Sequence, residues 1–559
     1  MNPQKSLSNV LSPTGENPVA EFYTLMNSVF NLNAKELAQA QSRYFERQMQ
    51  WWTSLWPGGQ SSESVAAPKK VDRRFDAPEW KEYPLFDYIK QSYVLTSNAL
   101  MKAVEAANLE EDTRKQMVFF TRQFIDAMSP SNFALTNPEV LKLAVESKGQ
   151  NFADGLRNLQ EDLKKGHISL SDDTAFEVGD NLGNTPGAVV YENELIQLIQ
   201  YGPTTGKVRE IPLLIVPSVV NKFYILDLRP ESSLIRYFIS EGFTVFAISW
   251  RNISAALQQL TWDDYVEKGV MKAIEVTREV TGQEKINAAG YCVGGTLLAC
   301  ALAVFAAHGK RPAASMTHLI AMLDYADPGE IGVYLDKHFS PQRLRALARG
   351  GVVSGKDLTR AFSSLRANDL VWSFVVGNYL KGKTPDAFDL FYWNTDDSNL
   401  PGPMFSYYNT ECYVKNNLIK PNAMTVCGTP IDLRKIDLPA YIFNAAEDHL
   451  VPWKSGYESV NHLEGDIQFV LGGGGHITGP INPVAKNKRN HWVNGTLSNK
   501  ADDWLASAQS IEGSWWPHWS AWLKQRSGKV VPARVNLGSA SHSIIEAAPG
   551  RYVKERVHP

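Results

Sequence analysis

The sequence predicts an α/β fold with a largely parallel sheet, preceded by an all-α N-terminal domain. From about residue 176 onward, short apolar segments alternate with longer helical ones, which is typical of a sheet covered by helices on both faces. A Gly-Tyr-Cys-Val-Gly sequence at 290–294 joins one of these strands to a helix. A carboxylate and a histidine then follow two later strands. Together these observations indicate an enzyme with a cysteine nucleophile.

Residues 1–175 are predicted to form the helical N-terminal domain, with residues 1–70 partly flexible. Three long segments with a helical recurrence of apolar residues follow one another: 85–108, 110–128 and 138–165. Before them, residues 21–56 have a helical pattern that ends in tryptophans, and a linker-like sequence follows. Such an aromatic helix face packs against a neighbouring helix or, alternatively, docks on a hydrophobic surface outside the protein.

Residues 176–559 are predicted to form the catalytic domain. The expected strands are 188–191, 196–201, 211–216, 243–248, 285–289, 315–323, 440–444 and 468–471. The alternation stops in residues 327–429, which are rich in aromatic and helix-forming residues. Because loops at this edge of a sheet surround the active site, we expect residues 327–429 to form a cap insertion over the nucleophile. A packed accessory subdomain without a gating role is the alternative.

Cys292 is the predicted nucleophile. Glycines at 290 and 294 allow the sharp strand-to-helix turn called a nucleophile elbow, which exposes the residue between them. The helix N-terminus and a nearby imidazolium favour the thiolate, which exchanges one C–S bond for another when it attacks a thioester. One alternative is a chance match around a small buried cysteine. Another is a membrane-spanning helix over 288–307, a stretch without charge, although its three early glycines argue against one.

Asp448 and His476 are the predicted acid and base. They follow the strands 440–444 and 468–471 in the chain order nucleophile, acid, histidine that an elbow enzyme needs. Asp448 would orient and charge-balance the ring, and His476 would deprotonate the thiol and later a hydroxyl. For both residues, an ordinary position in a surface loop is the alternative. His449, next to the acid, is expected to be a supporting group or a neighbour of the substrate.

Backbone N–H groups of Val220, Asn221 and Val293 are the predicted oxyanion donors. Val220 and Asn221 follow the strand 211–216, where an elbow architecture supplies one donor, and Val293 directly follows the nucleophile. The alternative is that the polar loop after this strand is only a connection.

Composition excludes several classes of partner and cofactor. The 559 residues carry a net charge of −3, with a pI near 6.4, which gives no reason to expect nucleic acid or a simple anionic membrane as a partner. The four cysteines are too few and too irregularly spaced for a disulfide framework or a zinc site, so they indicate a reducing compartment. The N-terminal residues lack the apolar core of a signal peptide. The predicted chemistry requires no metal and no bound cofactor.

A series of motifs resembles those of polyhydroxyalkanoate synthases, in particular the single-subunit type called class I. The motifs that carry the resemblance include GYCVGGTLLA, FYWN, EDHLVPW, GGHI, GSWWPHWSAWL and APGRYVK. The similarity covers nearly all of residues 80–559. It implies an α/β-hydrolase core with a cap insertion and a separate N-terminal domain. It also implies that Cys292 is the acylated nucleophile, Asp448 the acid and His476 the base.

The resemblance further implies an activity and its setting. The expected reaction transfers (R)-3-hydroxyacyl groups from coenzyme A to a growing polyester, with CoA as a leaving group and not a cofactor. A homodimer is expected in the cytoplasm at the surface of polymer granules, with granule-associated proteins as further partners. The alternatives are a cysteine-dependent esterase or thioesterase of the same fold and a granule-coating protein whose catalytic core has decayed. The preferred monomer length does not follow from the sequence.

Overall fold

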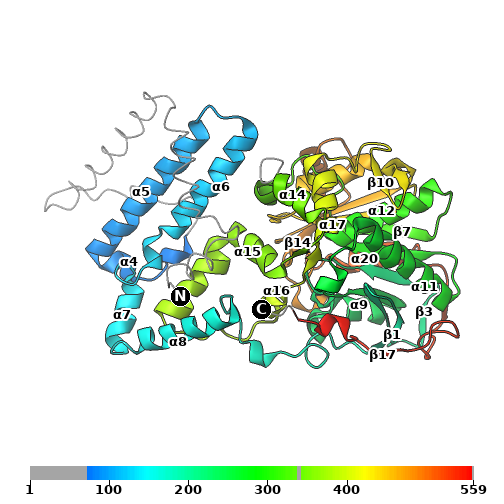
Figure 1. Ribbon diagram of the computed structural model, residues 1–559, viewed down its shortest axis with the longest axis horizontal. Coiled ribbons are helices and arrows are strands. Elements are labelled where there is room, and N and C mark those ends of the chain that lie inside the picture. Colours follow the sequence, from blue (N-terminus) through cyan, green and yellow to red (C-terminus); the bar gives the residue numbers. More distant parts are fainter. Residues whose placement is uncertain (1–71, 336–340, 557–559) are drawn as a thin grey trace. The chain divides into compact units, whose positions relative to one another are not determined.

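The computed structural model describes residues 72–335 and 341–556, which divide into two compact units (Figure 1). The first, the helical unit, comprises residues up to 172 together with 360–387. The second, the sheet unit, comprises residues 173–359 and the chain from 388 onward. The expectations for residues 1–70 fall outside the described residues.

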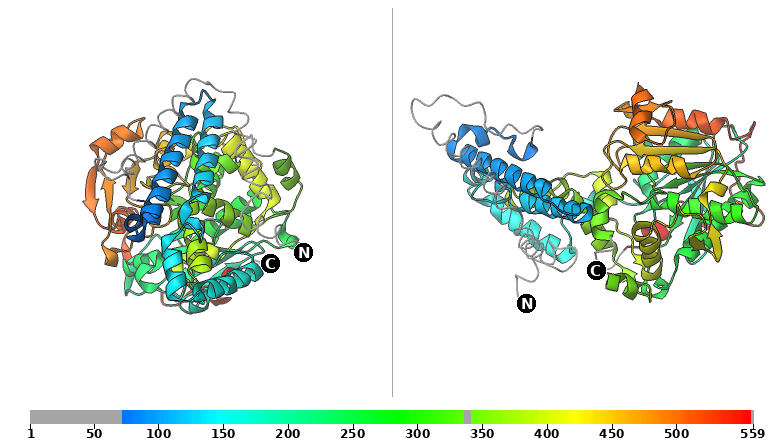
Figure 2. Two further views of the ribbon diagram at one scale, coloured as in Figure 1. Left: turned by 90° about the vertical axis from the view of Figure 1, so that its left-hand side faces the viewer. Right: turned by 90° about the horizontal axis from the view of Figure 1, so that it is seen from above.

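The helices of the helical unit lie in the three segments that the sequence predicts, with one short addition, α4. They are α4 (Glu79–Glu82), α5 (Pro84–Ala106), α6 (Glu111–Ala127), α7 (Pro138–Glu146) and α8 (Gln150–Lys165). The long helices α5 and α6 lie side by side (Figure 2). The helix expected over 138–165 is broken between α7 and α8, where Lys148 and Gly149 have φ angles of 53° and 82°. A left-handed backbone ends an α-helix, so this single predicted helix is wrong and two helices take its place.

The middle of the predicted insertion 327–429 belongs to the helical unit. Residues 360–387 include two short helical segments, η9 (Asn368–Trp372) and η10 (Val375–Leu380). Amide side chains of α8 hold the second segment by its backbone. Asn151 Nδ2 donates to the carbonyl of Leu380 at 2.8 Å, and Asn158 Nδ2 donates to that of Asn378 at 3.0 Å. The insertion is therefore divided between the two units.

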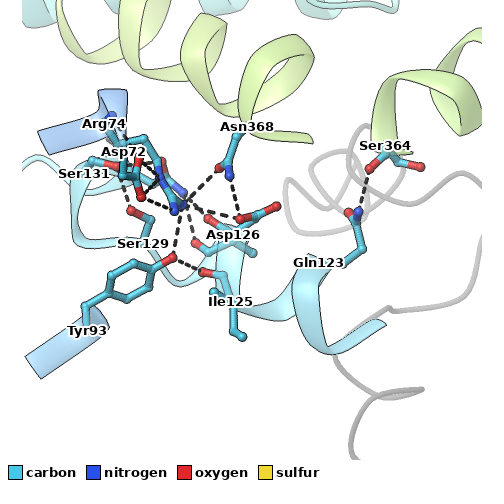
Figure 3. A network of polar contacts seen from close by, with 12 residues as sticks. Asp72, Arg74, Tyr93, Gln123, Ile125, Asp126, Ser129, Ser131, Ser364 and Asn368 are labelled. Atoms are coloured by element: carbon cyan, nitrogen blue, oxygen red, sulfur yellow. Dashed lines mark hydrogen bonds and ion pairs between the residues drawn. The ribbon is translucent and has the colours of Figure 1, made fainter. Parts of the chain in front are cut away.

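A polar network around Arg74 ties residues 360–387 to the first described residues (Figure 3). Arg74 Nη1 donates to Tyr93 Oη and to Asn368 Oδ1, each at 3.1 Å, and Arg74 Nη2 lies 2.8 Å from Asp72 Oδ2. Asn368 Nδ2 donates to Asp126 Oδ1 at 2.6 Å. Burial raises the pKa of Asp126, and the Arg74 charge opposes that rise. Because these partly buried groups satisfy one another, the network favours a single placement of η9 within this unit.

The sheet unit is built on an 11-stranded sheet with the order β15-β14-β13-β12-β7-β6-β4-β5-β2-β1-β17. Its strands are β1 (Gly187–Glu192), β2 (Ile196–Tyr201), β4 (Leu213–Val216), β5 (Val245–Trp250), β6 (Ile286–Tyr291), β7 (Ala313–Leu319), β12 (Ala440–Ala445), β13 (Ile467–Gly472), β14 (Asn490–Val493), β15 (Gln509–Glu512) and β17 (Glu546–Ala547). The central strands β5-β4-β6-β7-β12-β13 are parallel, and the outer pairs are antiparallel. The predicted parallel arrangement is confirmed for these six central strands, whereas the sheet as a whole is mixed.

Helices cover both faces of this sheet (Figure 1). Those on one face include α11 (Lys272–Thr281) and α12 (Val293–Ala307), and those on the other include α9 (Leu234–Ser240) and α20 (Trp516–Lys524). Within β4, Leu214 and Val216 enter the first core whereas Leu213 and Ile215 enter the second, because successive side chains of a strand point to opposite faces. The uncharged stretch 288–307 is thus the end of β6, a turn and a buried 15-residue helix. No helix in the described part of the chain is long and apolar enough to cross a bilayer.

His318 lies on the central strand β7 and is almost completely buried. Neither of its ring nitrogens has a hydrogen-bonding partner among the described residues. Burial therefore lowers the pKa of His318 to about 4, from the usual value of 6.5. The folded protein holds this ring neutral, whereas the unfolded chain takes up a proton below pH 6.5.

We expect the protein to lose stability as the pH falls from 6.5 to 4, because the unfolded state binds the His318 proton first. The loss from this group is on the order of 3 kcal/mol. His318→Leu removes the proton linkage and should flatten this part of the curve of denaturant midpoint against pH. His308→Leu, which changes a ring that bonds Thr429 Oγ1 near the surface, is the control and should leave the curve unchanged. Equal pH slopes for wild type and His318→Leu would contradict the assignment.

Candidate active site

Cys292 lies in the turn that joins β6 to α12. The backbone of this turn packs directly against neighbouring backbone. Cys292 has φ 52° and ψ −127°, a conformation that residues other than glycine rarely adopt. A Cβ atom on Gly290 would lie 2.4 Å from Gly295 Cα, and one on Gly294 would lie 2.2 Å from the carbonyl oxygen of Val216. Neither position accepts a side chain, so the two glycines that predict the elbow are both required by its packing.

The predicted acid and base form a buried pair. His476 Nδ1 lies 2.7 Å from Asp448 Oδ2, and the two side chains are 7% and 0% exposed. The other carboxylate oxygen, Oδ1, accepts hydrogen bonds of 2.9 Å from the backbone N–H groups of Leu450 and Val451. Because both carboxylate oxygens are engaged, Asp448 fixes the orientation of the His476 ring.

His476 interacts with Cys292 as well as with Asp448. Cys292 keeps part of its surface accessible and lies close enough to affect the pKa of the ring. Burial by itself lowers the pKa of His476, but the Asp448 carboxylate and the Cys292 sulfur raise it to about 10. The structure therefore brings Cys292, His476 and Asp448 together, and their roles as nucleophile, base and acid stay predictions.

The two predicted sources of oxyanion donors lie next to each other. Val293 is the first residue of α12, so its N–H has no acceptor within the helix. The loop after β4 begins beside the elbow, because a Cβ on Gly294 would lie only 2.5 Å from Pro217 O. Within this loop the N–H of Val220 donates to Ser218 Oγ at 3.2 Å, and Asn221 forms an isolated backbone bridge with Asp397. The role of these N–H groups toward an oxyanion stays a prediction.

His449 directly follows Asp448 and is half-buried. Its carbonyl oxygen lies 3.6 Å from the position that a Cβ on Gly329 would occupy. The turn after the acid therefore packs beside the start of the predicted insertion. The role of His449 as a supporting group or substrate neighbour stays a prediction.

A cluster of tyrosines beside Cys292 was missed by the sequence analysis. Tyr325 Oη lies 2.9 Å from Thr296 Oγ1 and 3.0 Å from Tyr408 Oη. The ring of Tyr413 packs edge-on against Tyr325 and Tyr408, with centroids 4.8 and 5.5 Å away. Burial raises the pKa of Tyr413, and the neighbouring Cys292 adds to the rise. The aromatic density of the insertion was the available signal, but it did not indicate which rings reach the nucleophile.

No group of three or more His, Cys, Asp or Glu side chains within residues 72–335 and 341–556 is arranged to hold a metal ion. The cysteines other than Cys292 form no disulfide; Cys300 and Cys412 are buried, and Cys427 is half-buried. That the reaction needs no cofactor stays a prediction.

Comparison with known proteins gives matches to two family models and to several curated relatives. Residues 71–238 match the model described as poly-beta-hydroxybutyrate polymerase (PhaC) N-terminus, and residues 212–483 match the alpha/beta hydrolase fold. The chain is 47% identical over 526 residues to the poly(3-hydroxyalkanoate) polymerase subunit PhaC of Cupriavidus necator, with 93% of this chain and 89% of the relative covered. It is 40% identical over 524 residues to the poly(3-hydroxyalkanoate) polymerase of Methylorubrum extorquens, with 92% and 86% covered. It is 37% identical over 503 residues to the PhaC subunit of Rhizobium meliloti, with 89% and 82% covered.

Gly294→Ala is expected to disrupt the elbow, because the new Cβ would collide with the carbonyl groups of Val216 and Pro217. A displaced Cys292 loses its alignment with His476, so its alkylation by iodoacetamide should slow by about tenfold or more, as misplacements near 1 Å do. The measurement is the rate at which the Cys292 peptide gains the alkyl group in mass spectrometry. Gly206→Ala is the matched control, since a Cβ there meets nothing within 4 Å. An unchanged alkylation rate in Gly294→Ala would show that the close approach is not needed.

Proposed function

Because the chain belongs to the poly(3-hydroxyalkanoate) polymerase family and is therefore an acyltransferase, we propose that it polymerises (R)-3-hydroxyacyl-CoA with release of CoA. The proposed substrates are 3-hydroxybutyryl-CoA and other short-chain units. The observation that carries the proposal is the buried Asp448–His476 pair, 2.7 Å apart, beside the Cys292 sulfur, which contributes to the raised pKa of the ring. The growing polyester is the second substrate in every cycle.

The first half of the proposed reaction acylates Cys292. The thiolate attacks the thioester carbonyl of hydroxyacyl-CoA, and backbone N–H groups of Val293 and of the loop at Val220 and Asn221 stabilise the resulting oxyanion. Collapse of this intermediate breaks the bond to the CoA sulfur, which leaves with the proton that His476 held. The products are an acyl-cysteine, a neutral imidazole and free CoA.

The second half forms the ester bond. Neutral His476 takes the proton from a 3-hydroxyl, and the hydroxyl oxygen attacks the acyl group on Cys292. The C–S bond breaks, so the thiolate and the imidazolium are restored as a pair. Asp448 supports the ring in both halves because its two oxygens are held by the ring and by backbone N–H groups. The residues of this chain supply the whole cycle, so no metal or bound cofactor is proposed.

Water must lose the competition with the hydroxyl nucleophile. The buried Tyr325 and the half-buried Tyr408 and Tyr413 pack their rings beside Cys292 and give this side of the site an aromatic wall, although each ring carries a hydroxyl. Such a wall limits the water near the acyl-cysteine and supports transfer over hydrolysis.

The proposed setting follows from an insoluble product. The enzyme works in the cytoplasm as a homodimer, at the surface of the polymer granule that it extends, where granule-associated proteins are its neighbours. The names of the relatives, poly(3-hydroxyalkanoate) polymerases, support the polymer product on which this setting depends. His449 is proposed as a supporting group of the site next to Asp448.

Cys292→Ala is expected to abolish both CoA release and polymer formation from 3-hydroxybutyryl-CoA, because the variant has no nucleophile. Purified wild-type enzyme should release one CoA for each unit found in insoluble polymer. CoA is measured with a thiol reagent, polymer by methanolysis and gas chromatography, and free hydroxyacid by chromatography.

Cys427→Ala is the matched control and should retain both products, because this half-buried cysteine lies away from the elbow and its Sγ faces the backbone oxygen of Asp263. Free hydroxyacid in place of polymer would identify a thioesterase. Polymer synthesis by Cys292→Ala would eliminate the proposed nucleophile, and wild-type protein without turnover would favour a granule-coating role.

A further inference from the structure

The loop 217–222, which carries the candidate oxyanion donors Val220 and Asn221, is held at both ends. Its first residue packs against the elbow at Gly294. Its last residue, Lys222, accepts a hydrogen bond of 2.7 Å from Trp393 Nε1 through its carbonyl oxygen. Between these points, the Asn221 backbone bridges to Asp397. A segment of the insertion, 393–397, therefore fixes the far end of the loop.

Asp396, in the middle of this segment, is a buried carboxylate with partners from two distant parts of the chain, residues 222–224 and Arg556. Its side chain is 1% exposed. Tyr224 Oη donates to Asp396 Oδ2 at 2.9 Å, and Arg556 Nη1 lies 3.0 Å from Asp396 Oδ1. Burial raises the pKa of Asp396, and the charges of Lys222 and Arg556 oppose this rise. The Asp396 carboxylate therefore attracts a positive charge from the loop, Lys222, and one from the C-terminal segment, Arg556.

Lys222 connects the loop to the same C-terminal segment. Its side chain is buried, and Nζ donates to the carbonyl oxygen of Glu555 at 2.7 Å. The side chain of Glu555 pairs with Arg251 at 3.1 Å, which anchors this segment beside the sheet. A buried lysine and a buried aspartate are each costly without partners, so the loop, the insertion and the C-terminal segment stabilise one common arrangement.

We propose that Asp396, together with Lys222 and Arg556, is a positioning residue that fixes the loop 217–222 so that its N–H groups face the oxyanion formed at Cys292. The inference rests on the proposed function, because it assigns this loop to the acyl-transfer step. Asp396 touches neither the substrate nor the triad, and it acts through the loop. Preorganised donors lose most of their effect when the loop shifts, and removal of one donor costs about 100-fold or more in turnover.

The test compares two reactions of the same sulfur in Asp396→Asn. Release of CoA from 3-hydroxybutyryl-CoA passes through an oxyanion, whereas alkylation of Cys292 by iodoacetamide does not. We expect kcat for CoA release to fall by about tenfold, part of the effect of a lost donor, with KM changed by less than about threefold. The alkylation rate of the Cys292 peptide should stay within about twofold of wild type, because the His476–Asp448 pair is intact.

Arg556→Gln gives a second route if Asp396→Asn does not fold, since Arg556 is half-exposed and easier to replace. Its kcat should fall by about threefold or more, and Arg556→Lys should restore most of the loss because it keeps the charge near Asp396. Asp432→Asn is the matched control, since it changes a carboxylate paired with Arg434 and should leave both reactions unchanged.

Equal losses of CoA release and of alkylation in Asp396→Asn would overturn the proposal in favour of a general structural role. Wild-type kcat in both Asp396→Asn and Arg556→Gln would overturn it as well. A wild-type protein that alkylates at Cys292 but releases no CoA would contradict the proposed function instead, so the two failures are distinguishable.

Discussion

The active site depends on the contact between bare backbone segments around Cys292. Gly290 lies against Gly295, and Gly294 lies against the end of β4, at distances that no side chain permits. This packing holds Cys292 in a strained conformation at the end of the parallel sheet. It also brings the start of α12 next to the loop after β4. The same backbone packing therefore fixes the positions of Cys292 and of the candidate oxyanion donors.

Most of the sheet unit could be predicted from the sequence because its strands are short apolar segments between helices and turns. Each of the eight expected strands overlaps an observed strand, and β6 leads into the elbow as expected. The edge strands β15 and β17 and the strand β14 next to β15 were missed, since all three are short and contain polar residues. The division of the insertion was also missed, because residues 360–387 are held by hydrogen bonds from Asn151 and Asn158 to backbone carbonyls, which leave no apolar pattern in the sequence.

The proximity of Asp448 and His476 to Cys292 could be predicted because strand ends in a parallel sheet meet at one edge, whatever their separation in the chain. The positions that sequence patterns could not find are those set by buried polar groups from distant segments. Asp396, Lys222 and Arg556 have no common motif, and each alone resembles an ordinary surface charge. Only their contacts around the buried Asp396 carboxylate reveal the cluster, and only the contacts among the rings reveal the tyrosines beside Cys292.

The central claim is that Cys292 carries the acyl group during polymerisation. The most direct measurement is rapid acid quenching of the enzyme after mixing with 3-hydroxybutyryl-CoA, followed by mass spectrometry of its peptides. The account predicts a hydroxybutyryl or oligomeric adduct on the Cys292 peptide that forms before polymer accumulates and disappears as substrate is exhausted. Polymer accumulation with no adduct on Cys292, or with the adduct on another residue, would contradict it.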